Sequence, residues 1–589
     1  PGYYSPADIY RTNFGLKLNH MLDEDSYYEV MYQYLRSKYW TFETDARDPQ
    51  LIEIYDGVWR DEAPYGYDGG EWMNLGRDSS LIQTHSLKAD YTRQVNTRNQ
   101  LKTGIRIIRN QLQVRSYTES DKDTWTREQN YDRSPYSIAA YIQNKLEYEG
   151  FIANLGLRTE YNNPNAPNYL LDPFDPIYSQ GLGSDLEENA DQEDAANFWT
   201  ISPRLGISHP ITDRSKLYFN YGHFHSEPAS TYRFRLQRES NGKVTSIGNP
   251  DLKLEQTIAY ELGYSHSIQD AYLINIATYY KDVRNQPGWI KYTSVDGSVN
   301  YSEPDNNNYA DIRGIELTLS KLKGDWFTGF VNYTYMVRTS GYFGLTHYYQ
   351  DPMEQRDFVA LNPQESRPVP TPYARLNLVF HTPHKFGPTL AGITPLEDWN
   401  LTLLASYRAG STWQWSEGNR TRTRPWVDSH SVSSRLARTF ETNLGDLEFF
   451  MDVSNLLNMK WLSYAGFAGS RDWLAYRASL HLPWEEGEQK GDDRLGDYRS
   501  WDTEYRPIYT TDSLSNVEQV PKSHEIFWES STNSYHVWDD AINDWAAEPV
   551  DQSAIDDLIE EKAYIDMPNI RSMSFLSPRK ITVGIRIKF

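Results

Sequence analysis

The sequence predicts an all-β fold, an antiparallel transmembrane β-barrel, on three observations. Segments of about 9–11 residues alternate between apolar and polar side chains, the spacing that turns one set toward lipid and the other toward a lumen. Short polar links and long links also alternate along the chain, as in a barrel with tight turns at one end and long loops at the other. No run of about 18 apolar residues is present, which excludes a transmembrane helix but leaves a membrane barrel open.

Composition narrows the class of protein further. The chain has 58 Lys and Arg against 81 Asp and Glu, a net charge of −23, which argues against nucleic acid as a partner. Its 18 Trp, 45 Tyr and 21 Phe make up 14% of the residues and indicate an ordered protein. The absence of Cys excludes a disulfide scaffold, zinc–thiolate clusters and thiol catalysis, and suits an oxidising compartment.

The alternation predicts roughly seventeen strands in this chain. The last is the clearest, because Ile581, Val583, Ile585, Ile587 and Phe589 share one face while charged or small residues share the other. The strands are expected at residues 12–20, 27–39, 85–95, 100–111, 137–148, 151–161, 201–209, 216–224, 256–267, 271–283, 311–321, 327–337, 373–382, 399–408, 428–440, 447–458 and 580–589.

The links between these strands predict the orientation of the barrel. Short links are found at 96–99, 147–150, 212–215, 269–270, 322–325 and 441–446, and the long ones between them are 41–84, 112–136, 162–200, 225–255, 284–310, 338–372, 409–427 and 459–579. If the last strand ends in the periplasm, the short links are periplasmic and residues 1–10 lie outside the cell. An odd number of strands that starts outside implies that strands are missing at the N-terminus.

The longest link, residues 459–579, is expected to be a folded extracellular cap, because a connection of about 120 residues is too long to lack structure of its own. Apolar residues at helical spacing predict one short helix between Asp551 and Ala563, with Asp551 or Ser553 as its N-cap. A further membrane strand at 474–482 would place 484–579 in the periplasm, but it would also leave the C-terminus outside the cell.

A series of short motifs between residues 140 and 589 resembles, in sequence and in order, the barrel of TonB-dependent outer-membrane receptors. The motifs are Ala140–Tyr148, Leu155–Tyr161, Ser202–Gly206, Asn249–Glu255 followed by Tyr260–Tyr264, Arg313–Leu317, Asn455–Asn458, and Leu576–Lys580 with the terminal Phe589. The last of these is similar to the large receptors that carry a carboxypeptidase-regulatory-like N-terminal domain. Each motif alone also fits a purely structural role, since Asn-Pro-Asp is a turn signal and glycine allows strands to approach closely.

The resemblance implies a barrel of about 22 strands in the full receptor, a plug in its lumen and a TonB box. Neither plug nor box is recognisable, so the chain is interpreted as the C-terminal portion of a longer receptor. Residues 1–458 would hold barrel strands and extracellular loops, 459–579 the long loop or cap, and 580–589 the closing strand. The implied location is the outer membrane of a Gram-negative-type bacterium. The implied partners are its lipid, the TonB complex, the barrel-assembly machinery acting on Phe589, and a possible surface lipoprotein or neighbouring protein.

Candidate sites are few. His223, His225 and Glu227 stand at period two and could hold a transition metal, although a polar lumen wall or strand end is the favoured interpretation. The acidic run 185–194 could bind Ca²⁺ but lacks the spacing of a calcium loop, which favours a solvated loop. The aromatic pairs Trp413 with Trp415 and Tyr348 with Tyr349 fit ligand stacking and loop packing about equally well.

Three classes of function remain. The first is active import: outer loops capture a ligand, and TonB supplies the energy to pass it through the barrel. An outer-membrane protease or lipase is disfavoured, because those barrels are small and no catalytic constellation or Gly-x-Ser-x-Gly elbow is present. The third is a barrel-anchored surface adhesion or assembly protein, which the long 459–579 link keeps open. No cofactor is expected.

Overall fold

The computed structural model describes residues 7–41, 76–118, 127–362, 368–389, 394–417, 420–442, 445–459, 496, 508–518, 520–521, 525–561 and 579–588. The chain folds into two units. The first contains residues 1–48, 70–322 and 332–372, and the second contains 49–69, 323–331 and 373–589. In the described part, no helix is long and apolar enough to cross a membrane.

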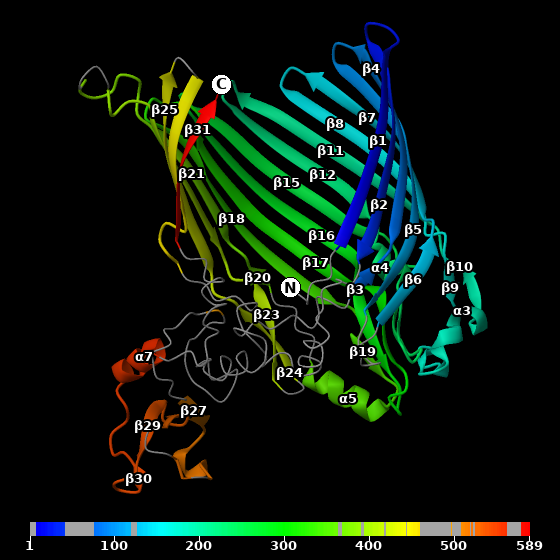
Figure 1. The fold of residues 1–589 in the computed structure, drawn as a ribbon, viewed down its shortest axis with the longest axis vertical. Helices are drawn as coiled ribbons and strands as arrows, with labels where there is room; N and C mark the ends of the chain where they lie inside the picture. The colour runs from blue at the N-terminus through cyan, green and yellow to red at the C-terminus, as the bar shows by residue number, and fades with distance from the viewer. Residues whose placement is uncertain are drawn as a thin grey trace, which may run out of the picture. The chain divides into compact units, whose positions relative to one another are not determined.

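Long antiparallel strands, each paired with the next in this series, form the wall of the first unit (Figure 1). They are β1 (Ala7–Met21), β2 (Ser26–Thr41), β4 (Leu81–Asn96), β5 (Asn99–Thr118), β7 (Tyr136–Tyr148), β8 (Phe151–Asn163), β11 (Phe198–Thr212), β12 (Ser215–Ser226), β15 (Glu255–Ile268), β16 (Tyr272–Thr293) and β17 (Asn300–Lys321). This succession is an up-and-down meander, as suits the antiparallel barrel that the sequence predicts.

The second unit repeats the pattern with β21 (Tyr373–His381), β22 (Trp399–Arg408), β25 (Ser429–Thr442), β26 (Gly445–Ser454) and β31 (Lys580–Lys588). The strand β18 (Phe327–Tyr342) is divided between the units: its residues up to 331 belong to the second unit and the rest to the first. The last strand pairs with β26, as expected, although more than a hundred residues separate them. All seventeen predicted strands are therefore confirmed. The terminal Phe589 lies outside the described residues.

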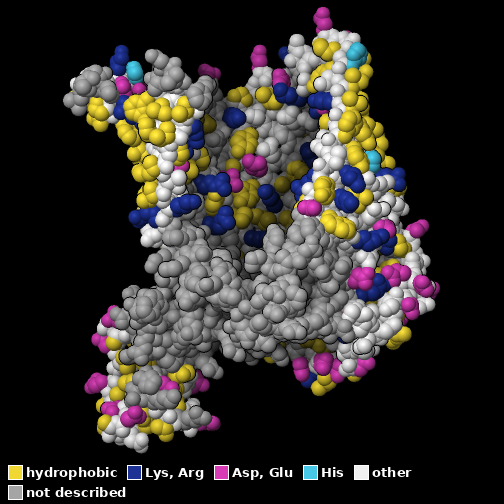
Figure 2. Space-filling model, in the orientation of Figure 1, with side chains coloured by type: hydrophobic (Ala, Val, Ile, Leu, Met, Phe, Trp, Pro, Cys, Tyr) yellow, Lys and Arg dark blue, Asp and Glu magenta, His cyan; other side chains and the backbone are white. Residues whose placement is uncertain are grey.

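Register sorts the side chains into an apolar and a polar face. In the second unit Phe449 lies opposite Ile585 and Met451 opposite Val583, and Val583 is 74% exposed. In the first unit, β1 and β2 also turn apolar side chains to the surface (Figure 2). The opposite face of the second unit is ionic: Arg435 and Arg586 pair with Glu448 at 3.0 and 3.1 Å. Exposed apolar side chains and paired charges on opposite faces fit lipid outside and water inside.

Short turns join the strands at one end. Gln269 and Asp270 both adopt positive φ, 50° and 54°, between β15 and β16. Two such residues in succession are the signature of a tight hairpin turn whose twist matches that of the flanking strands. The short link predicted at 269–270 is thus a tight turn.

The opposite, long-loop end differs from the prediction. The expected link 284–310 is instead largely strand, because β16 continues to Thr293 and β17 begins at Asn300. The pairing shifts register around Gln286, next to Asn285 at φ 57°. Pro287, Pro304 and the Asn306–Asn308 run are loop signals in isolation. A bulge and pairing with the neighbouring strand accommodate them in the sheet.

Shorter elements at this end of the first unit are β3 (Gly76–Asp78), β6 (Arg127–Arg133), β9 (Pro167–Tyr169), η2 (Pro176–Tyr178), η3 (Gly183–Asp185), α3 (Leu186–Asn189), β10 (Gln192–Asp194), α4 (Ser230–Phe234), β13 (Leu236–Glu239), β14 (Val244–Ile247), β19 (His347–Tyr349), α5 (Pro352–Leu361) and β20 (Val369–Pro370). We call residues 127–135, 164–197, 227–254, 284–309 and 343–350 the loop cap. It has a core of its own, in which Leu186, Val244 and Tyr301 are at most 1% exposed.

The long links of the second unit contain β23 (Thr412–Glu417), β24 (Arg420–Pro425), β27 (Ile508–Thr511), η6 (Leu514–Asn516), β28 (Ile526–Glu529), β29 (Ser534–Asp539), β30 (Asp544–Trp545) and α7 (Gln552–Glu561). The strands β27 to β30 form a small sheet, and Ile508, Trp528 and Ile555 belong to its core. The helix predicted between Asp551 and Ala563 corresponds to α7. The possible strand at 474–482 lies outside the described residues. The extracellular position of 459–579 stays a prediction.

Candidate functional site: a pocket in the loop cap

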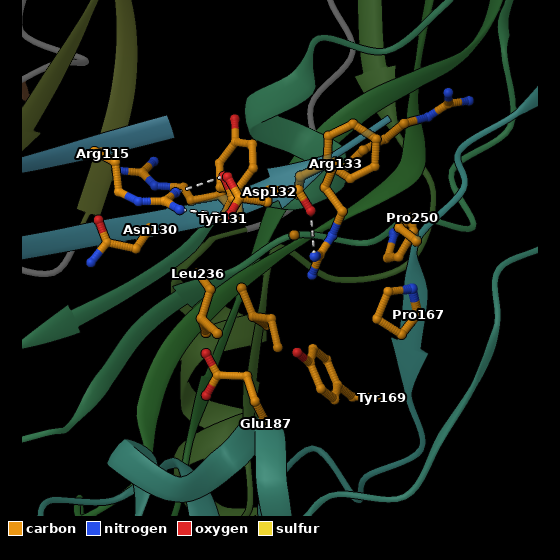
Figure 3. A pocket seen from close by; sticks show the side chains of 16 residues that line it. Arg115, Asn130, Tyr131, Asp132, Arg133, Pro167, Tyr169, Glu187, Leu236 and Pro250 are labelled. Atoms are coloured by element: carbon orange, nitrogen blue, oxygen red, sulfur yellow. Dashed lines mark hydrogen bonds and ion pairs between the residues drawn. The ribbon is translucent and has the colours of Figure 1, made fainter. Parts of the chain in front are cut away.

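A pocket of about 370 Å³ opens in the loop cap of the first unit (Figure 3). Its volume falls in the range of small-molecule sites, which is about 300–1,000 Å³. Five segments supply its walls: β5 with β6, the β9 segment, α3, α4 with β13, and the end of β14 with the turn that follows it. The lining residues most relevant to binding are Arg115, Arg133, Arg233, Arg235, Asp132, Glu187, Tyr131, Tyr169, Phe234 and Leu236.

The turn after β14 fixes one wall of this pocket by close backbone approach. The Gly248 amide donates to the Arg235 carbonyl at 2.5 Å, and the Asn249 amide donates to the Tyr232 carbonyl at 2.8 Å. A Cβ atom on Gly248 would lie 2.7 Å from the backbone of Arg233 and Phe234. Only glycine fits such an approach. The turn and α4 therefore hold each other in place.

The Asn249-Pro250-Asp251 motif connects three loops. Asp251 accepts hydrogen bonds from the Ala196 amide at 2.6 Å and from the Asn168 side chain at 2.7 Å. The Asn249 side chain donates to the Pro304 carbonyl at 3.3 Å. The motif is thus a structural junction of the loop cap, in keeping with its interpretation as a turn signal.

Two of the arginines that line the pocket are held firmly. Arg233, which is 2% exposed, donates to the Asn162 side chain at 2.8 Å and to the Leu252 carbonyl at 3.2 Å. The guanidinium carbon of Arg235 lies 5.6 Å from the ring centroid of Trp289, within cation–π distance. Arg133 is half-buried and donates to the Asp132 carbonyl at 2.8 Å.

Burial dominates the electrostatics of the pocket. It lowers the pKa of the Arg233 and Arg235 guanidinium groups, while Glu227 acts on Arg233 in the opposite direction. Burial likewise raises the pKa of the Tyr131 and Tyr169 hydroxyls. The pocket thus presents partly desolvated cations beside neutral phenol rings. Such an arrangement favours oxyanions and disfavours cationic ligands.

The predicted aromatic candidates Tyr348 and Tyr349 pack within the protein. Tyr348 stacks on Tyr292 at 5.5 Å, and Tyr292 in turn stacks on Tyr301 at 5.3 Å. Tyr349 stacks on His347 at 3.8 Å. These contacts favour loop packing for this pair. Of the other pair, the structure describes the backbone: Trp413 and Trp415 lie on β23, opposite Arg424 and Arg422 of β24.

The predicted metal candidates have other neighbours. His223 contacts the Tyr221 hydroxyl at 2.6 Å, and His225 contacts the Ser202 hydroxyl at 3.0 Å. In the described part of the chain, neither histidine nor Glu227 belongs to a group of three ligand atoms close enough to share an ion. The same holds for the acidic run 185–194, in which Glu187 pairs with Arg238.

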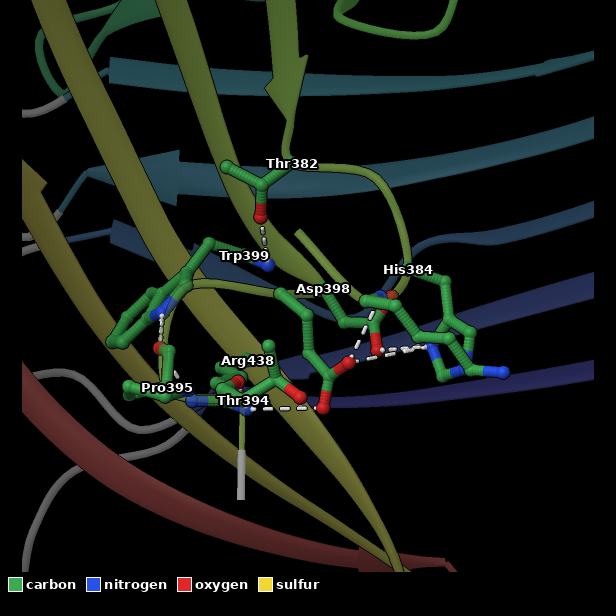
Figure 4. Close-up of polar contacts among 9 residues, drawn as sticks. Thr382, His384, Thr394, Pro395, Asp398, Trp399 and Arg438 are labelled. Carbon is green, nitrogen blue, oxygen red and sulfur yellow. Dashed lines mark hydrogen bonds and ion pairs between the residues drawn. The ribbon is translucent and has the colours of Figure 1, made fainter. Parts of the chain in front are cut away.

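One group within the described residues does meet that distance criterion, in the turn between β21 and β22 (Figure 4). Its ligand atoms, from His384, Glu397 and Asp398, all lie within 4.8 Å of one another. His384 is 70% exposed, however, and Glu397 also faces the guanidinium of Arg438 at 3.7 Å. The nearby positive charge weakens cation binding, so the turn is explained by its internal ion pairs.

Sequence reasoning missed the pocket arginines. Arg233 and Arg235 stand at period two just before the Asn249 motif, but Arg133 is a hundred residues away in the chain. Folding of the long loops brings them to one cavity, and a single sequence carries no signal for that packing.

The chain is similar to several solved outer-membrane proteins. The FrpB iron transporter from Neisseria meningitidis is 12% identical, with a TM-score of 0.47, and the match covers 78% of this chain and 60% of that one. The copper transporter OprC is 15% identical, with a TM-score of 0.46 and coverage of 76% and 59%. The import receptor Fiu from E. coli K12 is 12% identical, with a TM-score of 0.46 and coverage of 78% and 62%.

The chain therefore aligns with only about three fifths of the length of these solved structures. No curated protein matches it. A model of the outer membrane protein β-barrel family matches residues 73–391, more than half of the chain and including every residue that lines the pocket. The chain belongs to this outer-membrane β-barrel family, and its place is the outer membrane of Gram-negative bacteria.

Proposed function

We propose that this barrel is the membrane part of a TonB-dependent receptor, which captures a ligand in its loop cap and imports it across the outer membrane. The observation that carries the proposal is the loop cap with its preformed pocket. A receptor needs a concave site built before the ligand arrives, whereas a barrel that serves only as an anchor does not. The coupling to TonB rests on the resemblance of the barrel motifs.

The wall supports transport as well as capture. On its polar face in the first unit, Asp90 accepts a hydrogen bond from the Tyr141 hydroxyl at 2.6 Å and pairs with Lys88 at 2.5 Å. Such fully paired charges suit a water-filled or plug-filled lumen. The apolar opposite face suits lipid, and the strands are long enough to cross it, since about 9–11 residues suffice.

A barrel-anchored adhesion or assembly protein is the second candidate. The sheet of β27 to β30 with α7 favours it, because a separate folded module in a long link suits a surface that meets a protein partner. In this reading the partner is a surface lipoprotein or a neighbouring membrane protein.

Genetics separates the two candidates. The gene for the complete protein is deleted in its host, in strains with and without functional TonB, and growth is compared on iron chelates, oligosaccharides or oligopeptides as limiting nutrients. Import predicts a growth defect on one nutrient class that appears only in the TonB-positive strain. A defect of surface attachment that is the same in both strains, with normal growth on every nutrient, would support the anchored protein instead.

A further inference from the structure

Three arginines of the pocket form no direct ion pair within the described residues. Arg133, Arg233 and Arg235 pair with no carboxylate among the residues that the structure describes, and each has a buried Nε–H without an acceptor. The two carboxylates of the pocket are already engaged. Asp132 pairs with Arg115 at 2.6 Å, and Glu187 pairs with Arg238.

Such an arrangement is unfavourable for an isolated protein. A buried donor without an acceptor costs free energy, and a partly desolvated charge costs more unless an opposite charge compensates it. Arg233 shows the problem most sharply, because its Nη atoms are used by Asn162 and Leu252 while its Nε–H stays unpaired. An oxyanion in the pocket would lie against the three guanidinium groups that line it and neutralise part of their charge.

The remaining walls indicate what the anion is attached to. Tyr131, Tyr169 and Phe234 bring rings to the same cavity, and Leu236 adds an apolar side chain. Rings and apolar side chains pack against a sugar ring or an apolar group. A cavity of about 370 Å³ holds a small molecule or one residue of a chain.

We propose that the pocket binds the carboxylate or phosphate group of a small anionic ligand, whose ring or apolar body packs against Tyr131, Tyr169 and Phe234. The inference rests on the proposed function in one respect, that the bound anion belongs to the imported cargo. Binding itself requires neither TonB nor transport, so the pocket can be tested alone.

The test is titration calorimetry on the full chain purified in detergent, with glucuronate and inorganic phosphate as probes and glucose as the neutral control. Glucuronate or phosphate is expected to bind, and glucose to bind at least tenfold more weakly. Stronger binding of glucuronate identifies a carboxylate on a sugar-like body, and stronger binding of phosphate identifies a phosphate group. Raising the salt concentration from 50 to 500 mM is expected to weaken the binding, because screening reduces the attraction.

Variants assign the binding to the pocket. Arg133→Gln and Arg235→Gln each keep a polar side chain and remove one charge, and each is expected to weaken binding about tenfold or more, the effect of losing one charge-assisted hydrogen bond. Arg233→Gln is expected to act at least as strongly, but it also removes two internal hydrogen bonds. The first two variants therefore keep the test decisive if the third fails to fold.

Arg356→Gln is the matched control, because Arg356 in α5 is 68% exposed, pairs with Asp357 and does not line the pocket. It is expected to bind both anions as the unmodified chain does. The proposal would be overturned if neither anion bound the unmodified chain. It would also be overturned if the Arg133→Gln and Arg235→Gln variants bound the anions as tightly as the unmodified chain does. That result would leave a TonB-dependent growth defect untouched, so the two proposals fail independently.

Discussion

At the scale of single residues, the loop cap depends on a few polar side chains that join distant loops. Asp251 is the clearest case, because from segment 227–254 it accepts hydrogen bonds from a backbone amide and a side chain of segment 164–197. Asp251 is half-buried, and hydrogen bonds from neutral amides to a carboxylate of this kind stabilise by about 1–2 kcal/mol.

Asp251→Ala is expected to loosen the segment 164–197 and leave the strand wall folded. The Ala196 amide and the Asn168 side chain would both lose their acceptor. Limited proteolysis of the detergent-purified chain measures the effect as faster cleavage within 164–197. Asp270→Ala is the control, since Asp270 is 68% exposed, pairs with Arg214 at 3.4 Å and lies in the turn between β15 and β16, away from segment 164–197 in the chain. Equal cleavage of both variants would contradict this role for Asp251.

Glu303 makes the loop cap sensitive to pH. Burial, with the charge of Asp305 as a second cause, raises its pKa from 4.5 to about 7. The folded state thus holds this proton more tightly than the unfolded state, so its contribution to stability is complete below about pH 4.5 and is lost as the pH rises toward 7. The corresponding change is at most about 3 kcal/mol.

We therefore expect amides near Glu303 to exchange hydrogen faster at pH 8 than at pH 5, after correction for intrinsic exchange rates. Glu303→Gln should remove most of this difference, because an amide does not titrate. Glu193→Gln, which changes an exposed carboxyl group of β10, should keep it. A variant of Glu303 that retained the full pH dependence would show that another group is responsible.

At the scale of elements, strands were predictable and their extensions were not. Alternation found β31 and its neighbour β26 because each strand repeats one lipid-facing pattern with period two. The alternation pattern predicted that β16 ends ten residues earlier than it does. Pro287 and the asparagines on the paired strand are turn signals, but the pairing between β16 and β17 keeps both segments in the sheet. Local propensity is weak against pairing with a neighbouring strand.

The two faces of β31 predict opposite tolerance to charge. Ile585→Lys places an ammonium group on the apolar face, where Ile585 is 61% exposed, and should destabilise the folded barrel by about 2–4 kcal/mol. Thr582→Lys places the same charge opposite Asp452 on the polar face and should cost little. The folded fraction is measured by heat-modifiable mobility on gels across a urea series. Equal losses in both variants would contradict the assignment of faces.

At the scale of the whole molecule, the sequence predicts the barrel better than the site. A barrel repeats one pattern along every strand, so a single sequence contains it many times. The pocket occurs once and joins Arg133 to Arg235 through loops whose packing has no periodicity. Aromatic pairs stand out in the sequence, yet Tyr348 proves to pack on Tyr292 within the loop cap. That three of the pocket arginines form no ion pair within the described residues can be recognised only from the folded structure.

The central claim is that the loop cap faces the outside of the cell and the short turns face the periplasm. The chain has no Cys, so single cysteines can be labelled without background. Val295→Cys lies in the loop cap, where Val295 is 67% exposed, and Thr97→Cys lies in the exposed turn between β4 and β5. With a membrane-impermeant maleimide, intact cells should label Val295→Cys alone, and permeabilised cells should label both. Labelling of Thr97→Cys in intact cells, with Val295→Cys protected, would invert the barrel and contradict the account.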